Sequence, residues 1–143
     1  MRRLVLKMSI SLDGYVAGPN GEADWMFRHR DEAGHRWVED TLWQAGLHVM
    51  GSRSYFAMAG YWPTSSDSLA VPMNEIPKAV FSNTLREGTW PQTTIHSGDV
   101  VQAMQALKAQ DGGAILVHGG ARFAQTLTRA DLIDEYRLNM HPT

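Results

Sequence analysis

Residues 115–127 read ILVHGGARFAQTL and join an apolar run to an amphipathic tail through two glycines. The run at Ala114–Val117 is wholly apolar, which is typical of a central strand covered on both faces. In the tail, helical spacing of the apolar residues predicts a helix from about Ala121 to Thr128. The stretch therefore indicates a strand, a glycine turn and a helix in succession, the unit from which α/β proteins are built.

The same succession occurs elsewhere in the chain. Residues 47–50 are apolar and lead through Gly51 into a predicted helical turn, while residues 60–77, with their prolines and serines, read as a loop with one turn of helix. Asp99 is placed to cap a helix, and Gly46 to stop one. The predicted strands cover residues 4–12, 47–50, 78–82, 93–97, 114–117 and 136–140. The predicted helices cover residues 31–45, 52–58 and 121–128. A further helix begins at Val100, has Ala103, Met104 and Leu107 on the same face, and is closed by Gly112-Gly113.

Strands separated by helices, with a long strand of period two at each end, predict an α/β domain. We expect a mostly parallel central sheet with an antiparallel edge and helices on both faces. A chain of 143 residues, 43% of them hydrophobic, has enough apolar side chains for one core. The prediction is a single domain over residues 1–143.

Composition excludes several kinds of partner and site. Thirteen basic and fifteen acidic residues, spread without runs, do not favour a nucleic-acid partner. The chain has no cysteine, which excludes disulfides, thiolate metal ligands and cysteine nucleophiles. No apolar run reaches the roughly 18 residues of a membrane span, and the opening MRRLVLKMSIS alternates like a strand instead of a signal peptide. We expect a cytoplasmic protein whose partner is a small molecule or a second copy.

Three strand-to-helix or strand-to-loop junctions carry the polar groups of a binding site. In an open α/β sheet the ligand lies beyond the carboxyl ends of the strands. Glycine before a helix lets a ligand approach the backbone amides. The amino end of the helix is positive and favours an anion, and an arginine nearby can pair with phosphate. The junctions are Gly51-Ser52-Arg53-Ser54, Ser82-Asn83-Thr84 and Gly119-Gly120-Ala121-Arg122. Together they indicate a dinucleotide, although the Rossmann glycine fingerprint and the P-loop motif are both missing.

Longer stretches resemble one bacterial family. MSISLDGYVAGPNGEADW, VMGSRSYF, PKAVFSNTL and ILVHGGARFAQTL, followed by LIDEYRLNMHP, occur in that order. They resemble the dihydrofolate reductase-like proteins related to the C-terminal reductase domain of bifunctional riboflavin biosynthesis enzymes. The resemblance covers nearly the whole chain, and its most specific parts are SLDGYVAG and the LVHGG and DEYRL segments.

The resemblance implies a dihydrofolate reductase-like sheet that binds NADPH and a homodimer. Ala17 and Gly18 would approach the nicotinamide. The remaining cofactor contacts would fall on the three junctions. Gly51, Ser52, Arg53 and Ser54 would meet phosphates, Ser82, Asn83 and Thr84 the adenosine ribose and its 2'-phosphate, and Gly119, Gly120, Ala121, Arg122 and Phe123 the pyrophosphate. With Arg53 available and no acid at the corresponding strand end, NADPH is expected to bind more tightly than NADH.

Proton delivery needs a carboxylate, and the sequence offers two. Asp13 ends the first strand and Asp31 begins the following helix, close to where the family's acid is expected. Asp13 is equally readable as a turn residue and Asp31 as a helix cap. Trp25 either stacks on the substrate ring or anchors its loop in the core.

Other aromatic and histidine side chains have structural interpretations. His118 either contacts the cofactor or satisfies a backbone carbonyl. His29 and His35 are assigned to solvent and no metal is expected, while Trp37, Trp43 and Met104 are assigned to the core. Tyr55 and Phe56 either line the pocket or pack beneath it.

The leading hypothesis is an NADPH-dependent reductase of a flat heterocycle, either a riboflavin precursor of the 5-amino-6-ribosylaminouracil type or a pteridine such as dihydrofolate. The alternative is a non-catalytic nucleotide-binding domain on the same scaffold, and a transferase ranks last because the chain lacks a nucleophile elbow and a Walker lysine. Family members usually continue past the HP pair with a further strand. We therefore expect either a truncated chain or a partner subunit over the edge at residues 136–140.

Overall fold

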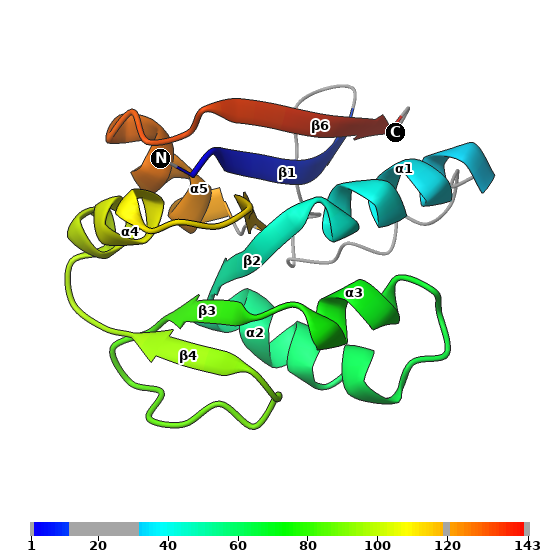
Figure 1. The fold of residues 1–143 in the computed structure, drawn as a ribbon, viewed down its shortest axis with the longest axis horizontal. Coiled ribbons are helices and arrows are strands. Elements are labelled where there is room, and N and C mark those ends of the chain that lie inside the picture. The colour runs from blue at the N-terminus through cyan, green and yellow to red at the C-terminus, as the bar shows by residue number, and fades with distance from the viewer. Residues whose placement is uncertain (1, 12–31, 119–120, 142–143) are drawn as a thin grey trace.

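The computed structural model describes residues 2–118 and 121–141 apart from residues 12–31. The described strands form one sheet of six in the order β4-β3-β2-β5-β1-β6 (Figure 1). The strands are β1 (Leu4–Ser11), β2 (Ala45–Gly51), β3 (Lys78–Phe81), β4 (Thr93–His96), β5 (Ala114–Val117) and β6 (Glu135–His141). The helices are α1 (Glu32–Trp43), α2 (Ser52–Ala59), the 3-10 helix η2 (Trp62–Thr64), α3 (Ala70–Glu75), α4 (Val100–Ala109) and α5 (Ala121–Arg129). The α/β prediction is confirmed.

The predicted antiparallel edge is wrong, because every described strand pair is parallel. The last strand, β6, pairs with β1 from Val5 opposite Glu135 to Ser11 opposite His141. The helix α5 carries the chain back along the sheet before β6 begins, so β6 must run in the same direction as β5. Alternation with period two fits either direction, and the sequence pattern could not distinguish them.

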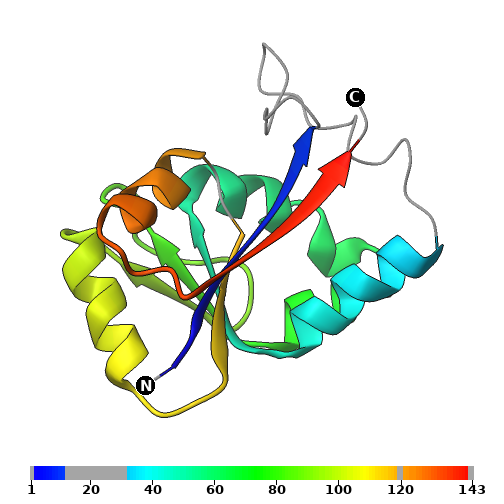
Figure 2. The same ribbon diagram turned by 90° about the horizontal axis from the view of Figure 1, so that it is seen from above.

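Helices cover both faces of the sheet, in three layers. On one face α4 and α5 bury Met104, Leu107 and Leu127 against the strands. On the other, Val38 and Leu42 of α1 pack in a second cluster. Figure 2 shows β1 and β6 side by side, with α1 on one side of them and α4 and α5 on the other.

Two tryptophans expected in the core lie at the surface instead. Trp37 and Trp43 are 38% and 46% exposed, because α1 turns Val38, Thr41 and Leu42 toward the sheet. Met104 is fully buried, as expected.

Gly46 does not stop the preceding helix. It lies inside β2, where the register with β5 shifts between Ala45 and Leu47. A Cβ atom at Gly46 would come within 2.9 Å of the backbone nitrogen of Gly113. The missing side chain therefore permits the close approach of β2 and β5.

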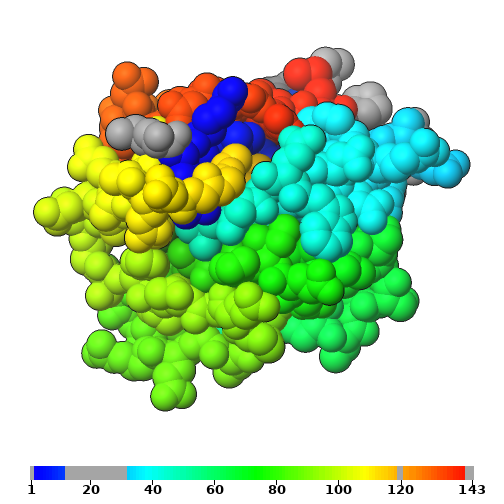
Figure 3. All heavy atoms as spheres, viewed as in Figure 1, coloured from blue at the N-terminus to red at the C-terminus, as the bar shows by residue number. Residues whose placement is uncertain are grey.

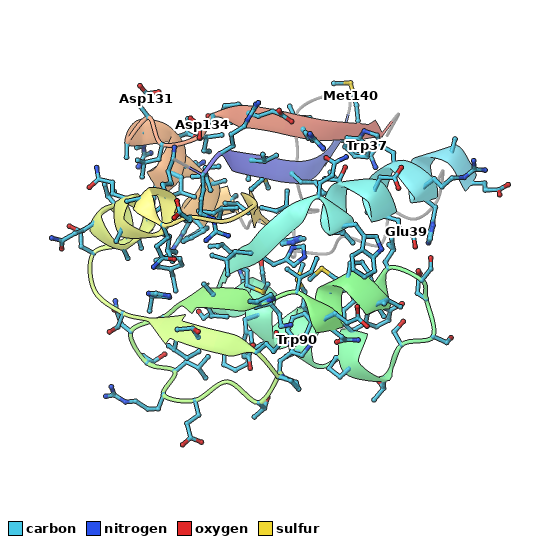
Figure 4. All side chains as sticks on the ribbon, in the orientation of Figure 1. Trp37, Glu39, Trp90, Asp131, Asp134 and Met140 are labelled. Atoms are coloured by element: carbon cyan, nitrogen blue, oxygen red, sulfur yellow. The ribbon has the colours of Figure 1, made fainter. Side chains whose placement is uncertain are left out.

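A buried lysine fixes α3 against the sheet. Lys78 is 1% exposed, and its Nζ donates hydrogen bonds to the carbonyl oxygens of Met73 and Ile76 at 2.9 and 3.0 Å. The same ammonium lies 4.5 Å from the ring centroid of Trp90, which Figure 4 shows near α3. Residues 60–77, expected to hold one helical turn, thus contain η2 and α3.

The edge strand β6 exposes apolar side chains. Tyr136, Leu138 and Met140 are each about half exposed, whereas the polar residues between them are partly covered. The atoms of β6 form the upper margin of the molecule in Figure 3, and Met140 points outward in Figure 4. No helix in the described part of the chain has both the length and the apolar character needed to cross a membrane.

Candidate active site

An open pocket of about 270 Å³ lies at the carboxyl ends of β2 and β3 and beside the start of α4. It is lined by Ser52, Phe81, Ser82, Asn83, Thr84, His96, Gly98, Val100 and Phe123. Side chains from two of the predicted junctions, at Ser52 and Ser82, meet here with Phe123, which directly follows the third junction, although these residues are far apart in the sequence. Parallel strands bring their carboxyl ends to one edge of the sheet, which explains the convergence.

Aromatic rings form one wall of this pocket. His96 stacks on Phe81 with ring centroids 5.2 Å apart, and Phe123 packs against the same phenylalanine at 5.3 Å. Offset and tilted arrangements at these separations are favourable for aromatic rings. The wall offers a flat surface on which a planar ligand can lie.

Polar groups opposite the rings are held by local turns. The Oγ atom of Ser82 accepts a hydrogen bond from the backbone N–H of Leu85 at 3.0 Å. The N–H of Gly98 donates to Asn83 Oδ1 at 2.8 Å, and this glycine has a φ of +86°. Only a residue without Cβ adopts such a φ readily, so Gly98 lets the loop turn back onto Asn83.

The first turn of α2 opens beside the pocket without a side-chain cap. Gly51 is the N-cap residue and makes no side-chain cap hydrogen bond, and Ser52 lines the pocket. The first amides of a helix have no partner within the helix and carry partial positive charge. This end of α2 can therefore accept an oxygen-rich or anionic group.

The remaining predicted residues divide into two sets. Ser54 and Ala121 belong to α2 and α5 but do not line the pocket, and Arg53 and Arg122 project from the same helices as exposed side chains. Within the described ranges, neither arginine pairs with a carboxylate. Asp13, Ala17, Gly18, Trp25, Asp31, Gly119 and Gly120 lie outside the described residues, so their predicted roles stay predictions.

Sequence reasoning missed Phe81, His96, Gly98 and Val100 as lining residues. Phe81 and His96 end adjacent parallel strands and pair directly in the register of β3 and β4. The rule that ligands lie beyond the carboxyl ends of strands would have found them, had the order of the strands been known.

A pair of histidines lies on the opposite face of the sheet, one in the middle of β2 and the other directly after β5. His48 Nδ1 is 2.8 Å from His118 Nε2. Burial, followed by the positive charges of Lys78 and Lys7, lowers the pKa of His48 to about 3. Burial, with His48 and Lys7 nearby, lowers the pKa of His118 well below its usual value, so both rings are neutral at pH 7. Within the described residues, His118 thus contacts the side chain of His48, a partner that the sequence analysis did not consider.

Contacts and exposure decide between the interpretations of His35, Tyr55 and Phe56. His35 is not in solvent, because its Nε2 lies 3.0 Å from Asp67 Oδ1. Tyr55 packs in the core and Phe56 is exposed. In the described segments, no group of three or more acidic or histidine side chains is arranged to hold a metal ion.

The sequence matches the family model described as the RibD C-terminal domain over residues 2–143. The chain belongs to the RibD C-terminal domain family. This domain is also 30% identical, over 146 aligned residues, to the uncharacterized protein YyaP of Bacillus subtilis (strain 168). The alignment covers 99% of this chain and 75% of YyaP.

Solved structures with the same fold include the following two. A putative riboflavin biosynthesis protein from Shewanella sp. PV-4 superposes with a TM-score of 0.72 at 22% identity, over 99% of this RibD C-terminal domain and 77% of that protein. A diaminohydroxyphosphoribosylaminopyrimidine deaminase/5-amino-6-(5-phosphoribosylamino)uracil reductase from Thermotoga maritima gives a TM-score of 0.63 at 16% identity. That match covers 94% of this domain and 44% of the Thermotoga protein, so this chain spans less than half of its length. At these identities the two structures support the fold alone.

Proposed function

We propose that this RibD C-terminal domain is an NADPH-dependent reductase. It transfers a hydride to a flat heterocycle, either a riboflavin precursor of the 5-amino-6-ribosylaminouracil type or a pteridine such as dihydrofolate. The observation that carries the proposal is the convergence of Ser52, Ser82 and Phe123 on one pocket beside an uncapped helix end. Family membership supports the same reaction class.

The pocket fits the adenosine half of the cofactor. A planar purine matches the wall formed by Phe81, His96 and Phe123, and hydroxyl groups of Ser82 and Thr84 are available to a ribose or its phosphate. Among the described residues no acidic side chain lines the pocket, and the nearby carboxylate of Asp99 accepts a hydrogen bond from the N–H of Gln102 and caps α4. The residues present therefore fit NADPH.

The nicotinamide of NADPH supplies the hydride, and the protein supplies binding, orientation and a route for the proton. Arg53 and the amides at the start of α2 would hold phosphate groups, with Arg122 at the start of α5 for the pyrophosphate. Asp13 or Asp31 would assist proton transfer, as the sequence predicts. The acceptor ring would lie at the crevice between β1 and β5, whose following helices α1 and α5 cover opposite faces of the sheet.

A binding and turnover experiment tests the proposal. NADPH binding is measured by calorimetry, and loss of nicotinamide absorbance is followed with a ribosylaminouracil-type acceptor and with dihydrofolate. We expect Phe123→Ala to weaken NADPH binding about tenfold, by loss of the aromatic wall. Phe56→Ala is the matched control, because Phe56 is exposed and lies outside the pocket.

The outcomes separate the possibilities. Binding without turnover on any acceptor supports the non-catalytic nucleotide-binding domain. Absence of NADPH binding by folded protein overturns the proposal.

We further propose that the chain works as a homodimer with a small heterocyclic substrate and without nucleic-acid or membrane partners. The exposed apolar residues of β6 support self-association. Sedimentation velocity tests it, and a monomer at micromolar concentration contradicts it.

A further inference from the structure

His48 and His118 form a polar contact on the α1 side of the sheet, with Lys78 and Lys7 nearby. His48 is fully buried between Lys78 on β3 and Leu116 on β5, its neighbours across the parallel pairs. His118 follows β5 directly and remains partly exposed. The two side chains therefore differ in exposure: His118 is partly exposed, whereas His48 is fully buried.

The arrangement of hydrogen-bond partners selects one proton distribution. His48 Nε2 is buried without a partner among the described residues. If His118 Nε2–H donated to His48 Nδ1, the neutral His48 would carry its proton on that buried Nε2, as a donor without an acceptor. If His48 Nδ1–H donates, the unpartnered Nε2 is only a bare acceptor. Buried unpartnered N–H groups are rarer than under-satisfied acceptors, so the second arrangement is favoured.

This choice fixes the proton of His118. Its Nε2 accepts the hydrogen bond from His48, and a neutral imidazole carries a single proton. The proton of His118 must then be on Nδ1, the ring nitrogen not used by His48. His118 is set as a hydrogen-bond donor before any ligand arrives.

His118 also lies near the place proposed for the acceptor ring, between β1 and β5. The pairing of Leu6 with Val117, and the hydrogen bond from the N–H of His118 to the carbonyl oxygen of Val49, place His118 at the carboxyl end of β5, between β1 and β2. Residues alternate between the faces along a strand, so His118 lies on the α1 side with Leu116, while Phe123 and the adenosine pocket lie on the α5 side. The histidine is thus separated by the sheet from the pocket proposed for adenosine.

We propose that His118 is a ligand-binding residue that donates its Nδ1–H to a carbonyl oxygen on a flat ring, and that His48 is the positioning residue that sets this proton. The inference rests on the reductase function proposed above and deepens it. Two rings carry such an oxygen. One is the nicotinamide, on its carboxamide group, and the other is an oxo-substituted pyrimidine or pteridine acceptor. His118 selects rings that present a hydrogen-bond acceptor at this edge and disfavours rings that present a donor.

Long-range ¹H–¹⁵N spectra of histidine-labelled protein test the proton positions directly. Without ligand, we expect His118 to carry its proton on Nδ1 and His48 also on Nδ1. In His48→Leu, His118 loses its fixed tautomer, whereas His48→Gln, which keeps an N–H donor, preserves it. Thr93→Val is the matched control, because it removes the other buried unpartnered polar atom and should leave His118 unchanged. A His118 proton found on Nε2 in the unliganded protein overturns the proposal.

Ligand titrations then separate the two ring sources and the two proposals. NADP⁺ is added alone, and then with folic acid or 5,6-diaminouracil. A shift of the His118 Nδ1–H with NADP⁺ alone assigns the nicotinamide carbonyl, and a shift only on addition of the second compound assigns the acceptor ring. If NADP⁺ shifts the amides of Ser82 and Phe123 but no addition shifts His118, this inference fails while the proposed function stands. If NADP⁺ shifts neither group, the proposed function fails.

The affinity of variants gives a second readout. We expect His118→Ala to lower, about tenfold, the affinity for the compound whose addition shifts the His118 signal. This corresponds to the loss of one hydrogen bond in a buried site. His118→Gln restores part of this affinity because it retains an N–H donor. Equal affinity in the wild type and His118→Ala contradicts the role.

Discussion

Lys108 Nζ lies 2.8 Å from Asp134 Oδ2 and joins α4 to the segment that leads into β6. Lys108 also donates to the carbonyl oxygen of Leu132 at 2.7 Å, and the same Asp134 oxygen accepts a hydrogen bond from the N–H of Leu4 at 2.8 Å. The hydrogen bonds from Lys108 and Leu4 lower the pKa of Asp134. Figure 4 shows Asp134 at the start of β6. Asp134, the aspartate of the DEYRL segment, therefore connects α4, β1 and the start of β6 through hydrogen bonds.

Replacing Asp134 by asparagine should destabilise the fold by about 1–3 kcal/mol, because the 7% exposed Lys108 would keep its charge without a carboxylate. Urea unfolding at pH 7 measures this change. Glu32→Gln is the control, since it breaks the exposed Glu32–Arg36 pair at 3.2 Å and should cost less than about 0.5 kcal/mol. Equal losses in the two variants would show that Asp134 has no special role.

Removing the hydroxyl group of Tyr55 should destabilise the fold. Its Oη accepts hydrogen bonds from the backbone N–H groups of Thr89 and Trp90, at 2.8 and 3.2 Å. Tyr55→Phe leaves these donors without their acceptor, and we expect a loss of about 1–3 kcal/mol in the free energy of unfolding. Tyr61→Phe at an exposed tyrosine provides the matched comparison and should be nearly neutral in the same thermal or urea melt. A neutral Tyr55→Phe would mean that water replaces the hydroxyl.

Arg53 should control the choice between NADPH and NADH. Its exposed side chain follows Ser52, which lines the pocket, so the guanidinium is expected to meet the 2'-phosphate. Arg53→Ala should lower NADPH affinity about tenfold and NADH affinity much less, as measured by calorimetry. Arg122→Ala should weaken both dinucleotides alike, because both carry the pyrophosphate. An unchanged NADPH-to-NADH ratio in Arg53→Ala would refute this placement.

Acid should destabilise the fold partly through the histidine pair. Burial lowers the pKa of His48 to about 3 and that of His118 well below its usual value, whereas histidine in an unfolded chain titrates near 6.5. Between about pH 6.5 and 3 the unfolded chain takes up protons that the folded chain does not. The free energy of unfolding therefore falls as the pH drops, by up to about 1.4 kcal/mol per pH unit for each histidine. Above pH 6.5 the pair does not change the free energy of unfolding as the pH rises, because both histidines are neutral in the folded and the unfolded chain.

Urea midpoints at pH 7.5 and 5.5 measure this slope in the wild type and in His48→Gln. The variant should lose less stability over that interval, because only one histidine still titrates abnormally. Asp134 and the other carboxylates are common to both proteins. Identical slopes would refute the assignment.

The sequence alone specified the secondary structure closely. The apolar run at Ala114–Val117 predicted β5, and the stretch KAVFS at residues 78–82 predicted β3. The Asp99 cap and the spacing of Met104 and Leu107 predicted α4. These features depend on neighbours in the chain, through periodicity and hydrogen bonds of two to four residues. Family motifs added the reductase class. The prediction that Trp37 and Trp43 lie in the core was wrong, because hydrophobicity alone does not say which face of an amphipathic helix meets the sheet.

The tertiary structure decided strand direction and the residues that meet. The sequence could not show that β6 runs parallel to β1, that His96 stacks on Phe81, or that His48 supports His118 across 70 residues. Each contact depends on which strands become neighbours, and that order is set by the packing of helices on both faces. Local patterns determine the elements because their energies are local, whereas the site arises where distant strand ends are brought together by burial of a common core.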